Sequence, residues 1–219
     1  MLPKGYDREM LFDLANKQEE LIKAVEAVNP NMVVVLNTGV PVKTEPWINS
    51  AKAFIDVFFS GQEAGNALAN ILFGKTNPSG KLVFSYIASK DKTPVFGHYG
   101  HEDLKAPYSE GIFVGYRYLD KNNIEPIYPF GFGLSYTSFK YSNVSVQDNG
   151  NLNVTVGLDV ENTGTVDGDE VVQLYVQPLD PAVERPVKEL KAFARVSLKA
   201  GRKNKLACSL ITVPLHTTT

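Results

Sequence analysis

The chain of 219 residues is 43% hydrophobic and 21% charged, which is typical of a globular protein with one large domain or two ordinary ones. Its formal net charge of −2 provides no basic field for nucleic acid or an anionic membrane, and no apolar run of about 18 residues predicts a transmembrane helix. The single cysteine, Cys208, excludes an internal disulfide and any metal or redox motif of paired cysteines.

Residues 14–29 carry the pattern of an amphipathic helix. Asn16 followed by Glu19 predicts a capping box, in which each side chain satisfies a free backbone N–H at the start of the helix. Asn29-Pro30 predicts the end of the helix. Between these signals, apolar residues recur at helical spacing, namely Leu21, Ile22, Val25 and Val28.

Two short apolar runs follow, MVVVL at residues 32–36 and AFIDVFF at residues 53–59. Such runs are typical of strands covered on both faces of a parallel sheet. The sequence also predicts a short helix around residues 47–52 and a longer one over residues 61–73, so strands and helices alternate. Only two strands are visible, whereas sheets average about five or six. We therefore expect part of an α/β domain, with an exposed strand edge and an uncovered apolar face.

The stretch from Tyr108 to Tyr141 is rich in glycine and aromatic residues, with the sequence YSEGIFVGYRYLDKNNIEPIYPFGFGLSYTSFKY. Its pattern fits neither helical periodicity nor strand alternation. Glycine permits positive φ and close backbone approach, while aromatic rings bury large rigid surfaces. We interpret the stretch as a connector that its rings hold against a folded domain.

Residues 139–213 consist of short alternating runs separated by turn signals such as Asp148-Asn149-Gly150. The runs predict strands at residues 141–146, 152–160, 170–176, 190–198 and 205–213. Regular short strands of this kind favour a β-sandwich. An immunoglobulin-like sandwich has about seven strands, so we expect this domain to be truncated.

Seven sequence blocks occur in order along the chain: Gly5-Tyr6-Asp7-Arg8; residues 18–36, with Asn29-Pro30-Asn31; Gly39-Val40-Pro41-Val42; Gly61-Gln62-Glu63-Ala64-Gly65; residues 72–82, with Asn77-Pro78-Ser79-Gly80; the stretch 108–141; and residues 160–176, with Asn162-Thr163-Gly164. Each block alone is weak, because several are only good turns or helix ends. Their joint order and spacing resemble the carboxyl-terminal part of family 3 glycoside hydrolases, of the β-glucosidase type.

The resemblance implies an α/β plus all-β chain. Residues 1–105 would be the C-terminal half of the family's mostly parallel α/β-sandwich domain, and residues 106–138 the glycine- and aromatic-rich connector. Residues 139–219 would be a truncated fibronectin type III-like, immunoglobulin-like β-sandwich.

The resemblance also implies the chemistry of a retaining β-glycosidase, which needs two carboxylates about 5–5.5 Å apart. In the family, an aspartate nucleophile comes from a (β/α)8-type barrel, and a glutamate of the α/β sandwich acts as general acid and base. A barrel takes about 250 residues, so we expect the nucleophile to be missing. Many members place the glutamate directly before Gly-Phe/Tyr-Asp-Arg, where this chain has Lys4. An ammonium with an ordinary pKa of about 10.4 cannot replace a carboxylate in this cycle.

We therefore expect no catalytic residue in the chain. It would be an inactive fragment of a β-glucosidase-like enzyme that hydrolyses terminal β-linked sugars in carbohydrate metabolism. Lys4 is either part of a fragment end unrelated to the family pattern or a true substitution. The alternative function is a non-catalytic scaffold module that binds carbohydrate or protein.

Asp7 and Arg8 are the substrate-loop candidates, because by the resemblance they would shape the loop beside the sugar; the alternative is a local ion pair or an N-terminal anchor. Trp47, the only tryptophan, lies among apolar neighbours and is expected in the core rather than as a sugar platform. His98 and His101 lie in a polar loop without the spacing that fixes metal ligands, so we expect no metal and no cofactor.

The expected partners are a β-glycoside substrate and the missing barrel domain, both in the full-length parent. The exposed sheet edge adds self-association. Neither nucleic acid nor a membrane is an expected partner. The single cysteine and the lack of an apolar leader favour a cytoplasmic location, unless the N-terminus is truncated.

Overall fold

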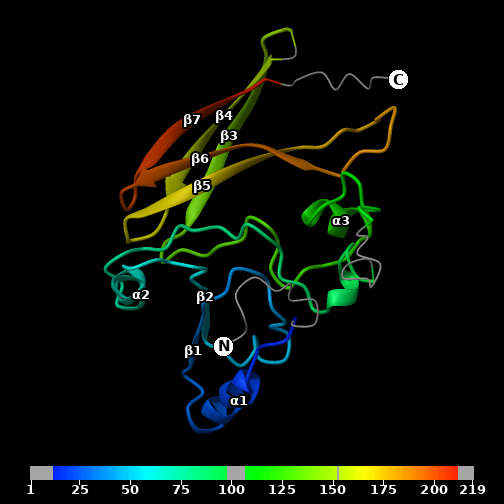
Figure 1. The fold of residues 1–219 in the computed structure, drawn as a ribbon. Coiled ribbons are helices and arrows are strands. Elements are labelled where there is room, and N and C mark those ends of the chain that lie inside the picture. Colours follow the sequence, from blue (N-terminus) through cyan, green and yellow to red (C-terminus); the bar gives the residue numbers. More distant parts are fainter. Residues whose placement is uncertain (1–11, 98–106, 152, 212–219) are drawn as a thin grey trace. The chain divides into compact units, whose positions relative to one another are not determined.

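The computed structural model describes residues 12–97, 107–151 and 153–211, which form two compact units (Figure 1). The first unit contains the residues up to Leu68 together with Leu82–Phe132 and Asp180–Val187. The second contains Ala69–Lys81, Gly133–Leu179 and the residues from Lys188 onward. Each unit is therefore assembled from separate stretches of the chain, and each has a hydrophobic core of its own.

The first unit is built on two parallel strands. β1 (Val33–Leu36) and β2 (Ala53–Asp56) pair in register from Val33↔Ala53 to Leu36↔Asp56 and lie side by side in Figure 1. α1 (Gln18–Val28) precedes β1, and α2 (Ala64–Leu72) follows β2. The predicted parallel sheet and its flanking helices are confirmed, and this sheet has two strands in the part of the chain that the structure describes.

The start of α1 differs from the predicted capping box. Asn16 and Lys17 both have left-handed backbone conformations, with φ of 54° and 62°, and no side chain caps the helix. A capping residue needs an extended backbone to turn its side chain toward the first N–H groups, so the prediction for Asn16 is wrong. The predicted end is confirmed, because Asn29 is extended and its N–H donates to Val25 O at 2.8 Å.

The predicted short helix around residues 47–52 is wrong, because residues 45–50 form turns instead. Lys52 N–H already donates to Met32 O at 2.8 Å, so the chain extends into β2 before a helical ladder can form. The longer predicted helix is confirmed as α2, although it begins only at Ala64.

The core of the first unit gathers around Leu36, Val42 and Tyr86. Trp47 is 1% exposed, and its ring meets that of Phe54 edge-on with 5.7 Å between the ring centroids. Aromatic pairs favour this arrangement, which adds to the stabilisation from the buried ring area. The predicted place of Trp47 in the core is confirmed.

The apolar side chains of α1 and β1 remain largely in solvent. α1 buries none of its residues, and its Leu21 and Val28 are 63% and 83% exposed. On β1, Val33 is 44% and Val35 is 37% exposed. The predicted uncovered apolar surface is therefore present in the described residues.

The glycine- and aromatic-rich stretch holds a helix that its pattern did not predict, α3 (Tyr116–Lys121). Gly115 precedes α3 with a φ of 59° and a ψ of −129°, a conformation that favours glycine. Farther along, Tyr86 N–H donates to Tyr128 O at 2.8 Å. The ring of Tyr128 meets that of Tyr86 edge-on and stacks on that of Phe54, with 6.4 Å and 6.2 Å between the ring centroids. For this part of the stretch, the interpretation as a segment held by its rings is confirmed. A short 3-10 helix, η1 (Lys90–Lys92), lies between Tyr86 and the stretch.

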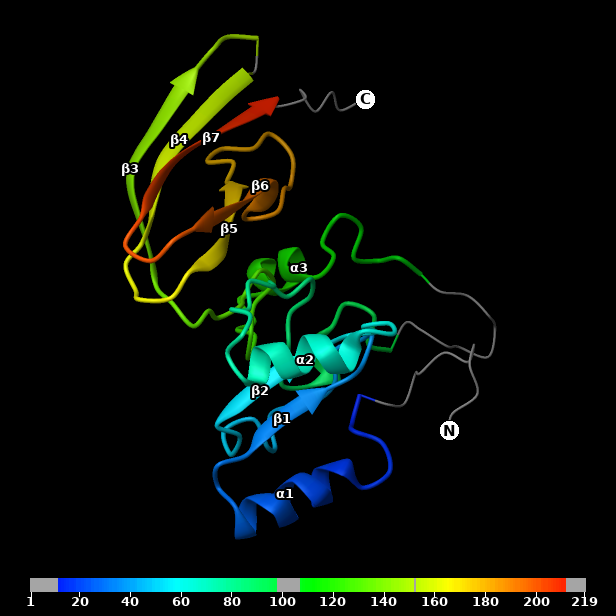
Figure 2. The same ribbon diagram turned by 90° about the vertical axis from the view of Figure 1, so that its left-hand side faces the viewer.

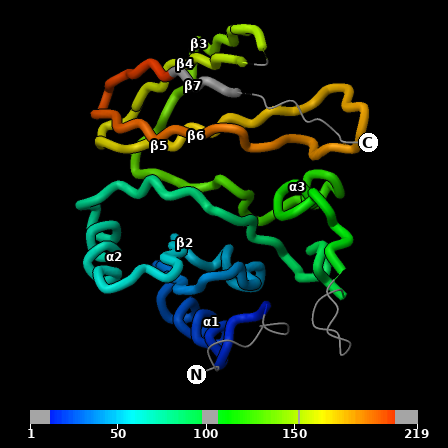
Figure 3. Tube along the Cα trace, turned by 45° about the horizontal axis from the view of Figure 1, so that its top comes forward, coloured from blue at the N-terminus to red at the C-terminus, as the bar shows by residue number. Residues whose placement is uncertain are grey.

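The second unit is a β-sandwich of antiparallel strands: β3 (Phe139–Asp148), β4 (Asn153–Asn162), β5 (Gly168–Val176), β6 (Glu189–Leu198) and β7 (Lys203–Ile211). One sheet has the order β3-β4-β7, and the other contains β5 and β6 (Figure 2). Figure 3 shows β5 and β6 running side by side. The five strands predicted for this unit are confirmed, with ends close to the predicted ones, although the predicted ends at residues 152 and 213 lie outside the described residues.

The core of the sandwich lies between its two sheets. Leu158 and Val160 of β4 form one cluster with Val172 of β5 and with Val196 and Leu198 of β6. Val160 is completely buried. Alternating residues of each strand thus supply the inward face, as the sequence pattern indicates. The predicted class, α/β plus all-β, is confirmed.

Candidate functional site

The acid/base position, the substrate-loop candidates and the two loop histidines are not among the residues that the structure describes. Lys4, Asp7 and Arg8 lie outside the described residues, and so do His98 and His101. Within the described ranges, no three His, Cys, Asp or Glu side chains gather in a group that could hold a metal ion. Nor is any helix in those ranges long and apolar enough to cross a membrane.

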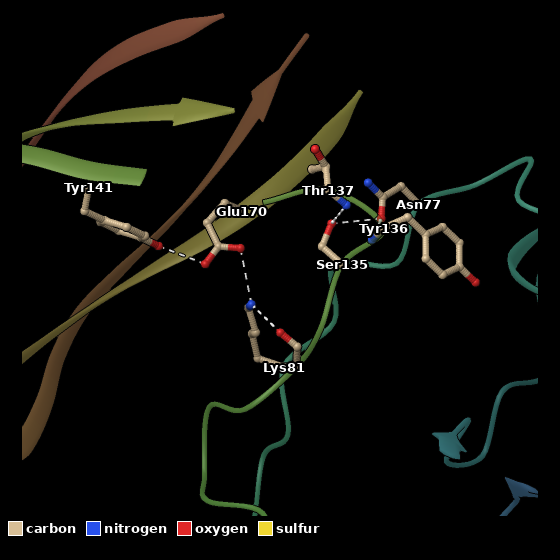
Figure 4. A network of polar contacts seen from close by, with 8 residues as sticks. Asn77, Lys81, Ser135, Tyr136, Thr137, Tyr141 and Glu170 are labelled. Atoms are coloured by element: carbon tan, nitrogen blue, oxygen red, sulfur yellow. Dashed lines mark hydrogen bonds and ion pairs between the residues drawn. The ribbon is translucent and has the colours of Figure 1, made fainter. Parts of the chain in front are cut away.

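Lys81 and Glu170 form the centre of a polar network inside the second unit (Figure 4). Lys81 Nζ lies 3.2 Å from Glu170 Oε2, and the two side chains are only 15% and 13% exposed. Lys81 Nζ also donates to Gly133 O at 2.8 Å, and Tyr141 OH donates to Glu170 Oε1 at 2.8 Å. Such charge-assisted bonds are strong where water is largely excluded. Because both carboxylate oxygens of Glu170 are engaged, this group is suited to holding chain segments together.

The backbone beside Lys81 requires glycine. A Cβ on Gly133 would overlap Gly80 O, so the two backbones approach more closely than any other residue allows. This approach brings Gly133 O within reach of the ammonium of Lys81. On the other side of Glu170, partial burial and then the hydrogen bond to Glu170 raise the pKa of the Tyr141 hydroxyl well above its ordinary value. Tyr141 therefore remains a neutral donor at physiological pH.

Asn77 joins the end of α2 to the segment before β3, as Figure 4 shows. Its Oδ1 accepts hydrogen bonds from Ser135 Oγ at 2.9 Å and from Tyr136 N at 2.8 Å. Its Nδ2 donates to Asp167 O at 3.0 Å. Tyr136 OH in turn donates at 2.8 Å to Ile71 O near the end of α2, a carbonyl that also accepts from Gly74 N at 3.0 Å.

Asn162, the last residue of β4, is completely buried and uses both polar atoms of its side chain. Oδ1 accepts from Thr137 Oγ1 at 2.6 Å and from Gly164 N at 3.1 Å. Nδ2 donates to Val166 O at 2.8 Å and to Leu198 O at 3.2 Å. One side chain thereby fixes the segment before β3, the turn after β4 and the end of β6.

In the first unit, Asp56 ends β2 at the carboxyl edge of the parallel sheet, the edge at which α/β folds bind ligands. Its Oδ2 accepts from Tyr86 OH at 2.7 Å, and its Oδ1 accepts from Phe58 N at 3.0 Å. Phe58 has a φ of 49°, which is not an extended conformation. β2 therefore ends at Asp56 and not at Phe59 as predicted. Burial, and then the hydrogen bond to Asp56, raise the pKa of the Tyr86 hydroxyl well above its usual value of about 10.

The polar network of the second unit was not predicted from the sequence, although its residues lie in blocks that carried the family resemblance. In the sequence, the block with Asn77 indicates only the end of a helix, and the block with Asn162 indicates only a turn. Glu170 carried a usable signal, because it alternates with Gly168 and Val172 on the inward face of β5, where a charge is rare unless paired. The partner, Lys81, had no comparable signal.

Two family models match the chain. The glycosyl hydrolase family 3 C-terminal domain matches residues 4–136, and the fibronectin type III-like domain matches residues 170–212. The first match contains Asn77 and Lys81, and the second contains Glu170. The two charged partners of the network therefore come from the two different family matches.

The chain is 43% identical over 212 residues to the thermostable beta-glucosidase B of Acetivibrio thermocellus, an alignment that covers 94% of this chain and 28% of that protein. Among solved structures, it is similar to the GH3 beta-glucosidase of Bifidobacterium adolescentis, with a TM-score of 0.91, 43% identity and coverage of 95% of this chain and 31% of that one. For beta-glucosidase 3B of Thermotoga neapolitana in complex with α-D-glucose, the TM-score is 0.89 at 35% identity, with coverage of 94% and 30%. The chain thus spans less than a third of each of these proteins. It belongs to glycosyl hydrolase family 3, in which it corresponds to the C-terminal domain and the fibronectin type III-like domain.

Proposed function

We propose that this chain is the C-terminal portion of a retaining β-glucosidase-like enzyme that hydrolyses terminal β-linked sugars. One observation carries the proposal: 94% of the chain aligns with a beta-glucosidase, of which it spans only 28%. A retaining mechanism needs two carboxylates about 5–5.5 Å apart. The barrel that supplies the nucleophile takes about 250 residues, more than the chain contains. The chain by itself is therefore inactive, and its role in catalysis depends on a barrel supplied from elsewhere.

Within the assembled enzyme, we assign residues 1–105 to the α/β-sandwich domain, residues 106–138 to the connector and residues 139–219 to the fibronectin type III-like domain. Asp7 and Arg8 shape the loop beside the sugar. The position of Lys4 is the place for the general acid and base, and a lysine there leaves the catalytic cycle without its second carboxylate.

The purified chain is expected to show no turnover of an aryl β-glucoside. The informative experiment mixes it with the barrel-bearing N-terminal portion of a relative and compares the wild-type chain with the variant Lys4→Glu. Turnover is expected only when both portions are present, and Lys4→Glu is expected to increase it by about 100-fold to 10,000-fold, the usual contribution of general acid–base catalysis.

Lys90→Glu, which makes the same charge change elsewhere in the first unit, serves as the matched control and should leave turnover unchanged. The anomeric configuration of the first product, read by NMR, should show retention. Turnover by the chain alone would contradict the inactivity of the isolated portion. Equal turnover with wild type and Lys4→Glu would contradict the role assigned to position 4.

We further propose that the free edge of β1 makes the isolated chain associate with itself. Among the residues that the structure describes, β1 pairs with β2 alone. β1 carries only Val and Leu, and it exposes Val33 and Val35. The edge strand β3 is different, because a bulge between Ser142 and Ser145 interrupts its ladder. Bulges and charges are the usual protection of an edge strand, and β1 has neither.

A charge on β1 is expected to reduce this self-association. Val33→Lys places an ammonium on a side chain that is already 44% exposed, so it disturbs the edge and spares the core. Light scattering over a range of concentrations should show a smaller associated fraction for Val33→Lys than for wild type. Val146→Lys, at a position 69% exposed on β3, is the control and should not change association. A wild-type chain that is monomeric at every concentration would argue against the proposal.

A further inference from the structure

The connection between β3 and β4 is a tight hairpin with the sequence Asp148-Asn149-Gly150 near its tip. All three residues are exposed, and Gly150 has a φ of 75°. Two backbone hydrogen bonds close the hairpin: Asn149 N–H donates to Asn153 O at 2.9 Å, and Asn153 N–H donates to Gly150 O at 3.0 Å. The paired strands begin immediately below, at Asp148 and Val154.

Asn149-Gly150 is the only Asn-Gly pair in the chain. The carboxamide carbon of an asparagine can form a five-membered ring with the backbone nitrogen of the next residue. When that residue is glycine, no Cβ obstructs the approach or restricts the backbone rotation that it needs. The pair therefore combines an electrophilic carbon with the least hindered backbone nucleophile that a protein offers.

The hairpin also places a base on the nucleophile. Gly150 N–H donates to Asp148 Oδ1 at 2.9 Å, so a carboxylate already accepts a hydrogen bond through the proton that this nitrogen must lose. A distance of about 2.6–3.2 Å is that of a competent general base. The nitrogen that must leave, Asn149 Nδ2, donates to Thr155 Oγ1 at 2.8 Å. The contacts thus involve both atoms whose bonds to hydrogen change in the reaction.

We propose that Asn149 is a site of spontaneous deamidation, in which Asp148 assists the attack of Gly150 N on the Asn149 side chain. The bond from Gly150 N to Asn149 Cγ forms, the bond from Cγ to Nδ2 breaks, and Nδ2 departs as ammonia. The proton from Gly150 N passes by way of Asp148 to the departing nitrogen. Water then adds to one of the two carbonyls of the cyclic imide and opens it to aspartate or isoaspartate, with no oxidant or cofactor.

The product changes the hairpin in two ways. Either product places a second carboxylate next to Asp148 and makes the net charge one unit more negative than −2. Isoaspartate also adds a methylene to the main chain between residues 149 and 150, which disrupts the two hydrogen bonds that close the turn. The core residues of β4, Leu158 and Val160, lie farther along the strand, so the sandwich itself remains folded.

Peptide mapping of the full chain after prolonged incubation tests the proposal. The peptide with Asn149 is expected to gain the mass that distinguishes a carboxyl from a carboxamide and to appear as two isomers. Its conversion should be several-fold faster than that of the peptides with Asn49-Ser50 and Asn66-Ala67. Asn149→Gln, whose longer side chain disfavours the ring, should abolish the conversion at this position.

Asp148→Asn isolates the contribution of the neighbouring carboxylate and is expected to slow conversion several-fold. Asp180→Asn removes an equal charge from an exposed loop and should leave the rate unchanged; far-UV circular dichroism checks that both variants fold. The site is overturned if Asn149 stays intact in the folded chain while the denatured chain converts, because the hairpin then protects it. Equal rates for wild type and Asp148→Asn would overturn the assistance by Asp148.

Discussion

The variant Lys81→Met is expected to lose about 3 kcal/mol of unfolding free energy from the second unit, because it breaks a largely buried ion pair from one side. Methionine keeps most of the aliphatic stem of Lys81 but leaves the carboxylate of Glu170 with the hydroxyl of Tyr141 in place of an ammonium. Gly133 O also loses its charged donor. Denaturant titration followed by circular dichroism, together with hydrogen exchange of peptides from β5, measures the loss.

Lys199→Met is the matched control for Lys81→Met. Lys199 pairs with Asp167 at 2.7 Å, but these side chains are 80% and 55% exposed, so water screens the pair and little stability is expected to depend on it. The double variant Lys81→Met/Glu170→Gln should recover part of the loss, since it removes the stranded charge. If Lys81→Met and Lys199→Met shift the midpoint of the denaturant transition equally, the buried pair stabilises the second unit no more than the exposed pair does.

Asn162→Ala is expected to lose about 3–4 kcal/mol, because four hydrogen bonds of about 1 kcal/mol each end on one buried side chain. The substitution leaves the hydroxyl of Thr137 and the N–H of Gly164 without their acceptor, and the carbonyls of Val166 and Leu198 without their donor. Buried polar groups without a partner retain their full desolvation cost. The same denaturant titration measures the effect.

Two further variants separate the possible causes of that loss. Asn162→Asp has nearly the same volume and keeps the acceptor for Thr137, but it turns a carboxylate oxygen toward two carbonyls. A loss as large as that of Asn162→Ala would therefore show that the amide donors, and not the volume, are needed. Asn149→Ala removes one exposed hydrogen bond and should change stability little. If Asn162→Ala changes the unfolding free energy only slightly, the four hydrogen bonds of Asn162 do not stabilise the second unit as proposed.

The elements of this fold were predictable where their signals are local. Alternating apolar and polar residues, with turn residues around them, predict β4 and β6. Four consecutive apolar residues predict β1. α3 was not predictable in this way, because its start depends on a backbone conformation of Gly115 that no periodicity encodes. The capping box failed for a similar reason, since the left-handed conformation of Asn16 is not visible in its identity.

The polar network could not be predicted, because its partners are far apart in sequence. Lys81 and Glu170 are separated by 89 positions, and Asn77 and Asp167 by 90. A turn motif such as Asn77-Pro78-Ser79-Gly80 explains its own local geometry so well that nothing in it indicates a distant contact. The family resemblance rested on blocks that contain these residues, but only the fold shows which of their side chains meet.

The discontinuity of the second unit has a consequence for inheritance. A gene segment that encodes only residues 139–211 contains every sandwich strand that the structure describes, so by its strand pattern it resembles a domain that can be transferred on its own. It would nevertheless transfer Glu170 without Lys81, and the turn at Asp167 without Asn77, since both partners belong to Ala69–Lys81. Recombination between Lys81 and Gly133 is therefore expected to be selected against. The sandwich should pass between lineages together with the end of the α/β portion, as a single heritable block.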